Sequence, residues 1–148
     1  MLSGPKHRVA MPRSLDEVIH NQDLGQLRLA RPEEILAISR TIPQMDVIDA
    51  ELGDWRAIYF AALYGKHGFK RIHLLGDNLR KGIGGKITSP VLAIDLGTGL
   101  AVTRSGSMYR LFGEHGNGEP PRHQIHLLCA ALWAWGHGNA LGVVRAGL

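Results

Sequence analysis

Large apolar residues recur at every second position between Ile87 and Gly113, which is the spacing of β-strands with one buried face. Gly97-Thr98-Gly99 and Ser105-Gly106 interrupt this pattern and predict two hairpin turns, so the stretch forms a meander of three short antiparallel strands. The expected core face of this meander contains Leu92, Ile94, Leu96, Leu100, Val102, Tyr109 and Leu111.

The register of the first hairpin decides which residues reach that face. A three-residue loop pairs Ile94 with Val102 and keeps the large residues together, with Gly99 in a left-handed conformation at the end of the loop. Pairing Ile94 with Ala101 would put large residues on opposite faces, so we prefer the first register.

Four other segments are predicted to be helices, two from capping-box spacing or from Pro and acidic residues in the first turn, and two from an apolar stripe along one side. These are residues 14–22, the stretch from Pro32 to Pro43, residues 47–64 and residues 121–135. A further strand is expected at Arg71–Leu75. Strands gathered between helices, rather than alternating with them, indicate an α+β protein. We expect a small antiparallel sheet, the three-strand meander plus one or two short strands, covered by helices.

The expected organisation is a flexible basic arm at residues 1–13, followed by one α+β domain at residues 14–148. A short strand near Gly142–Arg145 is possible within the Gly-rich tail. No apolar run approaches the roughly 20 residues that cross a bilayer, so no membrane contact is expected. The first residues lack the apolar core of a signal peptide, and Cys129 is the single cysteine, which together predict a cytoplasmic protein.

A basic, glycine-rich run at 65–86 is the main candidate for a binding surface. The formal net charge is +4, and this run contains one acidic residue, Asp77. Glycines let backbone N–H groups approach an anion and the cations add charge, so the run predicts contact with nucleic acid or another anion. The alternative is a solvated loop beside a sheet edge. Together with two arginines of the meander, the candidate residues are Lys66, Lys70, Arg71, Arg80, Lys81, Lys86, Arg104 and Arg110.

Histidines near the last predicted helix offer an alternative site. His123 and His126 are three residues apart and share a helix face, and His115 and His137 lie nearby in the sequence. If the four converged, they would bind a metal ion and support a metal-assisted hydrolase or nuclease. Solvated histidines at a helix start are the simpler interpretation.

Cys129 is predicted to be a buried apolar residue rather than a nucleophile, and no cofactor is predicted.

Two segments of the meander region resemble sequences of known proteins. Thr88-Ser89-Pro90-Val91 and the T-x-S-G-S-x-Y-x-L hairpin at residues 103–111 resemble small uncharacterised proteins of proteobacterial phages and plasmids. Proteins of that mobile-element type include anti-CRISPRs and other inhibitors of host defence, which usually act by binding. The resemblance therefore implies a binding protein, and it assigns no catalytic residue.

The sequence thus favours a small non-enzymatic binding protein of mobile-element type. It would inhibit or modulate a nucleoprotein complex, such as a host-defence system, through the basic surface. A homodimer formed through a sheet edge or through the helix that carries Trp133 and Trp135 is a further possibility.

Overall fold

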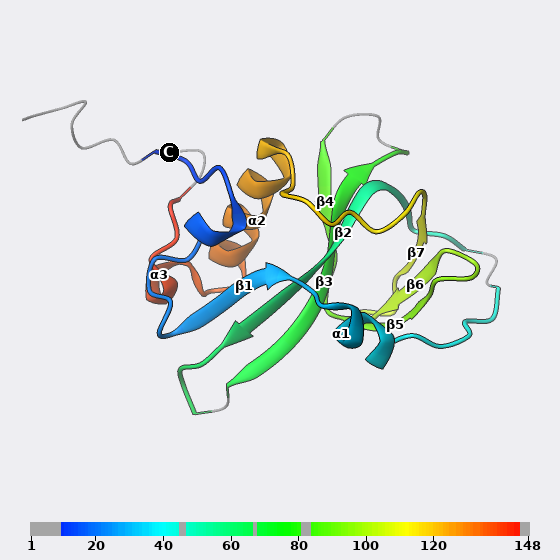
Figure 1. Cartoon of the computed structure of the whole chain (residues 1–148), viewed down its shortest axis with the longest axis horizontal. Helices are drawn as coiled ribbons and strands as arrows, with labels where there is room; N and C mark the ends of the chain where they lie inside the picture. The colour runs from blue at the N-terminus through cyan, green and yellow to red at the C-terminus, as the bar shows by residue number, and fades with distance from the viewer. Residues whose placement is uncertain (1–9, 45–46, 67, 81–83, 146–148) are drawn as a thin grey trace, which may run out of the picture.

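The computed structural model describes residues 10–44, 47–66, 68–80 and 84–145 (Figure 1). Among these residues, the strands are β1 (Gly25–Leu29), β2 (Ala50–Ala62), β3 (Phe69–Asn78), β4 (Gly85–Ile87), β5 (Val91–Asp95), β6 (Leu100–Thr103) and β7 (Met108–Leu111). The helices are α1 (Pro32–Ala37), α2 (Arg122–Ala134) and α3 (Gly138–Leu141), preceded by a 3₁₀ turn at Leu15–Glu17. None of the helices in this described part is long and apolar enough to cross a membrane.

The strands form one mixed sheet in the order β4-β3-β2-β7-β6-β5, and β1 also pairs with β2. β2 is antiparallel to β1 and β3 and parallel to β7. β1 and β7 share one edge of β2: β1 pairs with Ile58–Ala62, whereas β7 pairs with Ala50–Leu52. In Figure 1, α2 and α3 lie to one side of the long β2–β3 hairpin, and the meander of β5 to β7 lies at its other end.

The predicted α+β class is confirmed, but the predicted sheet was too small. It has seven strands in the described residues rather than a three-strand meander with one or two additions, and one strand pair is parallel. The helices lie mostly outside the sheet. A core on one face joins α2, α3 and the 3₁₀ turn to β2 and β3, and we call it the outer core.

The predicted helix at residues 47–64 is wrong, because this segment forms strand β2. A β-bulge between Gly53 and Arg56 adds a residue to the strand, with Asp54 at a φ of 44°. A second core lies on the opposite face of the sheet from the outer core, and the bulge changes which positions of β2 face it. Leu52 faces this core before the bulge, and Trp55 faces it after the bulge. This step of three residues imitates helical spacing. β2 is also buried on both faces from Trp55 to Ala62, so it lacks the alternation of a half-exposed strand.

The second core, which we call the inner core, lies on the concave face of a curved sheet. It unites side chains from β2 and β3 with side chains from the meander and α1, so β5 lies against β3 across this face. Its buried residues are Ala30, Ile35, Ala50, Leu52, Trp55, Ala57, Tyr59, Ala61, Leu74, Val91, Ile94, Ala101, Tyr109 and Leu111.

The three meander strands are confirmed, but their predicted register is wrong. Ile94 pairs with Ala101, the arrangement that the sequence disfavoured, and Val102 pairs with Met108. The predicted register fails because both meander faces are covered: Ile94 joins the inner core, while a smaller cluster buries Ile42, Ala93, Leu100 and Met108 on the opposite face. An irregularity of β5 between Val91 and Ala93 takes Leu92 out of the strand pattern, so Leu92 is 50% exposed although it was expected in the core. Gly99 has the expected positive φ, at 73°.

The remaining helix predictions differ in length. α2 confirms the helix at 121–135, while only Leu15–Glu17 is helical within 14–22. α1 ends at Ala37, because the following chain turns to pair with β5 and the Arg40 N–H donates to the Ile94 carbonyl. The described residues 142–145 form no strand, and β1 was not predicted. Of the predicted basic arm, residues 1–9 lie outside the described part, and Met11 packs on the outer core.

The outer core contains a buried histidine. His73 is 1% exposed, its ring stacks on Trp135 with centroids 4.5 Å apart, and its Nδ1 lies 2.7 Å from the Thr88 carbonyl oxygen. Its Nε2 is buried without a hydrogen-bond partner in the described residues. Burial disfavours the charged ring and lowers the pKa of His73 to about 4.

We predict that this histidine makes stability fall with acidification. The unfolded chain binds the proton near pH 6.5 and the folded chain near 4, so its contribution is complete above pH 6.5 and is lost as pH falls to 4. The maximal slope is about 1.4 kcal/mol per pH unit. Urea unfolding of wild type and His73→Phe at pH 7 and pH 5 should show a smaller pH difference in the variant. Equal differences would contradict the prediction.

A second prediction concerns the bulge of β2. A Cβ at Gly76 would lie 2.9 Å from the Gly53 carbonyl oxygen and 3.2 Å from the Trp55 Cα, so β3 passes close beneath the bulge. Gly76→Ala should lower the free energy of unfolding by about 1–3 kcal/mol. Gly118→Ala is the matched control, since a Cβ there meets nothing within 4 Å. Urea denaturation measures the free energy of unfolding of both variants. Equal losses would contradict the prediction that the close approach of β3 to the bulge makes Gly76→Ala the more costly change.

Candidate anion-binding groove

A groove of about 240 Å³ lies beside β3, on the concave side of the sheet. Lys70, Arg71 and Ile72 of β3 form one wall, and Pro90, Val91 and Arg104 from the start of β5 and the β6–β7 turn form the other. Tyr59 of β2, with Glu34, Ala37 and Ile38 at α1, completes the lining. Tyr59 and Ile72 are cross-strand partners, so they lie side by side on the same face of the sheet.

The groove exists because β4 is much shorter than β3. β4 pairs only with Leu75–Asp77, and Thr88 adds two bonds to Leu74: its N–H donates to the Leu74 carbonyl, and its hydroxyl accepts from the Leu74 N–H. The chain then turns away at Pro90, which cannot donate to a ladder. Within the described residues, no strand pairs with this side of β3 between Phe69 and His73.

The direction of the free backbone groups follows from Leu74. Successive residues of a strand point their N–H and C=O groups to opposite sides, and those of Leu74 point toward the β4 side. The N–H and C=O groups of Ile72 and Lys70 therefore point to the open side, whereas those of Arg71 and His73 point toward β2.

Three cations line this groove without an acidic partner. Lys70, Arg71 and Arg104 form no salt bridge within the part of the chain that the structure describes. Burial, and secondly the positive charge of Arg104, lower the pKa of Arg71. The Arg71 guanidinium lies over the Phe69 ring, 3.7 Å from its centroid, which restrains the side chain. The arrangement is a restrained pair of like charges with space for an anion.

The acid at the rim of the groove is already neutralised. Glu34 accepts two hydrogen bonds from the Arg28 guanidinium, at 2.7 and 3.0 Å, and one from the Arg31 N–H at 2.7 Å. The hydrogen bond from Arg28 is the main reason that the pKa of Glu34 is lowered, so the carboxylate stays charged and paired. The groove keeps its excess of positive charge.

Hydroxyl groups lie next to Arg104 in the β6–β7 turn. The Ser105 Oγ is 2.8 Å from the Ser89 Oγ, 3.1 Å from the Thr103 Oγ1 and 3.3 Å from the Ser107 Oγ. Gly106 has a φ of 88°, as a turn residue requires. No histidine contacts this serine in the described residues, so the group is a polar turn without the parts of a nucleophile.

The structure separates the eight predicted cations. Only Lys70, Arg71 and Arg104 line the groove, and Lys66 is exposed in the turn that precedes β3. Arg80 lies beyond the opposite end of β3, roughly 30 Å along the strand, where it pairs with Glu51 at 3.6 Å. The remaining members are elsewhere: Lys86 on β4, Arg110 beside a separate depression near Ile42 and Thr98, and Lys81 outside the described residues.

The four candidate histidines do not converge. His115 packs against Trp55, with ring centroids 5.2 Å apart, and His123 pairs with Asp77. His137 contacts Tyr64 in the outer core, and the buried Nε2 of His126 has no partner in the described residues. No group of three or more metal-ligating side chains comes together among the residues that the structure describes. The geometry therefore gives no support to the alternative of a metal site.

Cys129 is fully buried, as the sequence predicted. Burial raises the pKa of its thiol to about 11, because a charged thiolate would lose its hydration. The thiol therefore lacks the thiolate character that a nucleophile needs.

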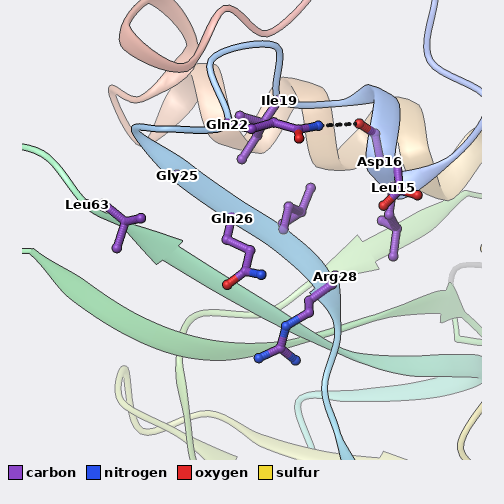
Figure 2. A pocket seen from close by; sticks show the side chains of 9 residues that line it. Leu15, Asp16, Ile19, Gln22, Gly25, Gln26, Arg28 and Leu63 are labelled. Atoms are coloured by element: carbon purple, nitrogen blue, oxygen red, sulfur yellow. Dashed lines mark hydrogen bonds between the residues drawn. The ribbon is translucent and has the colours of Figure 1, made fainter.

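A larger hollow, of about 410 Å³, follows the outer edge of β1. Figure 2 shows that Gln26 and Arg28 extend from β1 and that Gln22 reaches toward the 3₁₀ turn, where its Nε2 donates to the Asp16 carbonyl oxygen. Arg28 is the single cation of its lining, and it is already paired with Glu34. Among its lining residues, this hollow offers no unpaired cation that would select an anion.

Several residues of the β3 groove were missed by the sequence predictions. Tyr59 was assigned to a helix, and Ile72, Pro90 and Ile38 were considered only as parts of elements. A local signal existed at Pro90, which marks the end of pairing along β3. The meeting of β3 with the β6–β7 turn has no local signal, because it depends on the curvature of the sheet.

No protein-family model matches the chain, and searches of curated proteins and of solved structures found no match.

Proposed function

We propose that the protein is a non-enzymatic binding protein that holds a polyanionic partner, such as a nucleoprotein complex of a host-defence system, at the β3 groove. The observation that carries this proposal is the pair formed by Arg71 and Arg104. Both line one groove, burial and then the positive charge of Arg104 lower the pKa of Arg71, and no acid of the described chain forms an ion pair with either of them. An anion placed between them would remove this repulsion.

The other charged groups support the assignment to this groove. Arg28, Arg56 and Arg80 each pair with a carboxylate, whereas Arg71 and Arg104 form no ion pair in the described part of the chain. Lys70 adds a third cation to the same wall. Since the candidate histidines lie apart, the geometry favours binding over metal-assisted hydrolysis as the function.

We predict that binding to a polyanion depends on the groove. Heparin is a suitable probe, because it presents dense negative charge without base or peptide chemistry. The double variant Arg71→Gln/Arg104→Gln should elute from a heparin column at clearly lower salt than wild type, since it loses both unpaired charges. Thermal unfolding of each protein checks that the fold is retained.

The matched control is Arg13→Gln/Arg122→Gln, which changes two exposed arginines away from the groove. Both double variants lower the formal net charge from +4 to +2, because each substitution removes one charge. The control should elute close to wild type. An equal shift for both variants would mean that overall charge, rather than the groove, retains the protein, and the proposed function would then be wrong.

A further inference from the structure

The open side of β3 offers more than charge. The N–H and C=O groups of Lys70 and Ile72 point into the position that a longer β4 would have occupied. The unpaired stretch from Phe69 to His73 is about 17 Å long, enough for a short added strand. An open strand edge beside a groove is the arrangement by which many domains bind extended peptides.

We propose that the groove binds an extended acidic segment of a protein, which adds to β3 as a strand in the place of a continued β4. This inference rests on the proposed function and names the chemistry of the partner that the groove receives. The backbone of the segment pairs with Lys70 and Ile72, and its carboxylates lie near Arg71 and Arg104.

The lining of the groove determines the side-chain pattern of the segment. Alternate residues of an added strand point to opposite faces of the sheet. One set faces the apolar surface formed by Ile38, Ile72 and Val91 on the inner side. The other set lies on the opposite face of the sheet, toward Arg71. Arg71 shares that face with His73, which stacks on Trp135 in the outer core. The expected segment therefore alternates apolar and acidic residues.

The aromatic rings near the groove disfavour a single-stranded nucleic acid as the occupant. Recognition of single strands relies on exposed aromatic faces on which bases stack. Here the Arg28 guanidinium lies 4.0 Å from the centroid of Tyr59, which is only 8% exposed. The Arg71 guanidinium covers Phe69. Neither ring presents a free face, whereas the backbone edge is open.

Charge also disfavours a second copy of the chain. Two β3 edges that paired with each other would bring Lys70 and Arg71 of one copy close to the same residues of the other. Like charges directly opposite destabilise a strand pair. An acidic strand meets no such repulsion.

The test uses the full-length protein, the end-blocked peptide Glu-Val-Glu-Val-Glu-Val-Glu, and single-stranded oligothymidylate. Hydrogen exchange of backbone amides, followed by NMR, reads out the edge directly. The peptide should slow exchange at Lys70 and Ile72, whose N–H groups point to the open side. Arg71 and His73 should change little, because they already face β2. Arg71→Gln/Arg104→Gln should weaken peptide binding about tenfold.

A pair of variants isolates the backbone contribution. Lys70→Pro removes both the charge and the outward N–H group, whereas Lys70→Ala removes only the charge. Proline is tolerated on an edge strand where the N–H faces away from the sheet, and circular dichroism verifies folding. Lys70→Pro should bind the peptide about tenfold more weakly than Lys70→Ala, the loss expected for one hydrogen bond.

The outcomes separate this inference from the proposed function. If oligothymidylate binds at the groove and the peptide does not, the acidic segment is wrong and polyanion binding stands. Peptide binding without protection of Lys70 and Ile72 overturns the added strand. A ligand-free dimer in which these amides are already protected identifies a second copy as the occupant. If neither probe binds and heparin retention does not depend on the groove, both proposals are wrong.

Discussion

The burial of β2 on both faces and along both edges is the constraint on which the rest of the fold depends. Ile58 and Phe60 are at most 1% exposed in the outer core, and Ala57 and Ala61 are as deeply buried in the inner core. β3 occupies one edge of the strand, and β1 and β7 divide the other. The bulge at Gly53–Arg56 separates the part of β2 that pairs with β7 from the part that pairs with β1, and β5 lies against β3 across the inner core.

The bulge is fixed by polar contacts as well as by packing. The Arg56 guanidinium, which is 8% exposed as a residue, donates to the Gly118 carbonyl at 2.8 Å and to the Asp54 carbonyl at 3.2 Å. Gln124, at the start of α2, donates to the same Asp54 carbonyl at 3.2 Å. The bulge of β2 thus positions both α2 and the loop that precedes it. Hydrogen bonds from Arg56 and from the Gln124 amide nitrogen to one carbonyl favour a single arrangement of the bulge.

The same bulge limits what the sequence could reveal. α2 was predicted because its apolar stripe faces one core, and the meander strands were found because their turns are local signals. β2 has two buried faces and a change of phase, so its pattern imitated a helix. In the meander, burial of both faces removed the information that selects a register. For the groove, the sequence identified Lys70, Arg71 and Arg104 as candidates, yet it could not show that residue 104 meets residue 71, because sheet curvature joins them.

The half-buried residues Arg28 and Arg71 show two different environments for a charge. Arg28 and Glu34 form a double hydrogen bond, which satisfies both groups within the fold. Arg71 and Arg104 instead face an open groove without a carboxylate, while Phe69 restrains Arg71. A restrained, unpaired cation loses little side-chain entropy on binding, and it gains a partner that the chain does not supply. Under the proposed function, the anionic partner therefore offsets the repulsion between Arg71 and Arg104 when it binds.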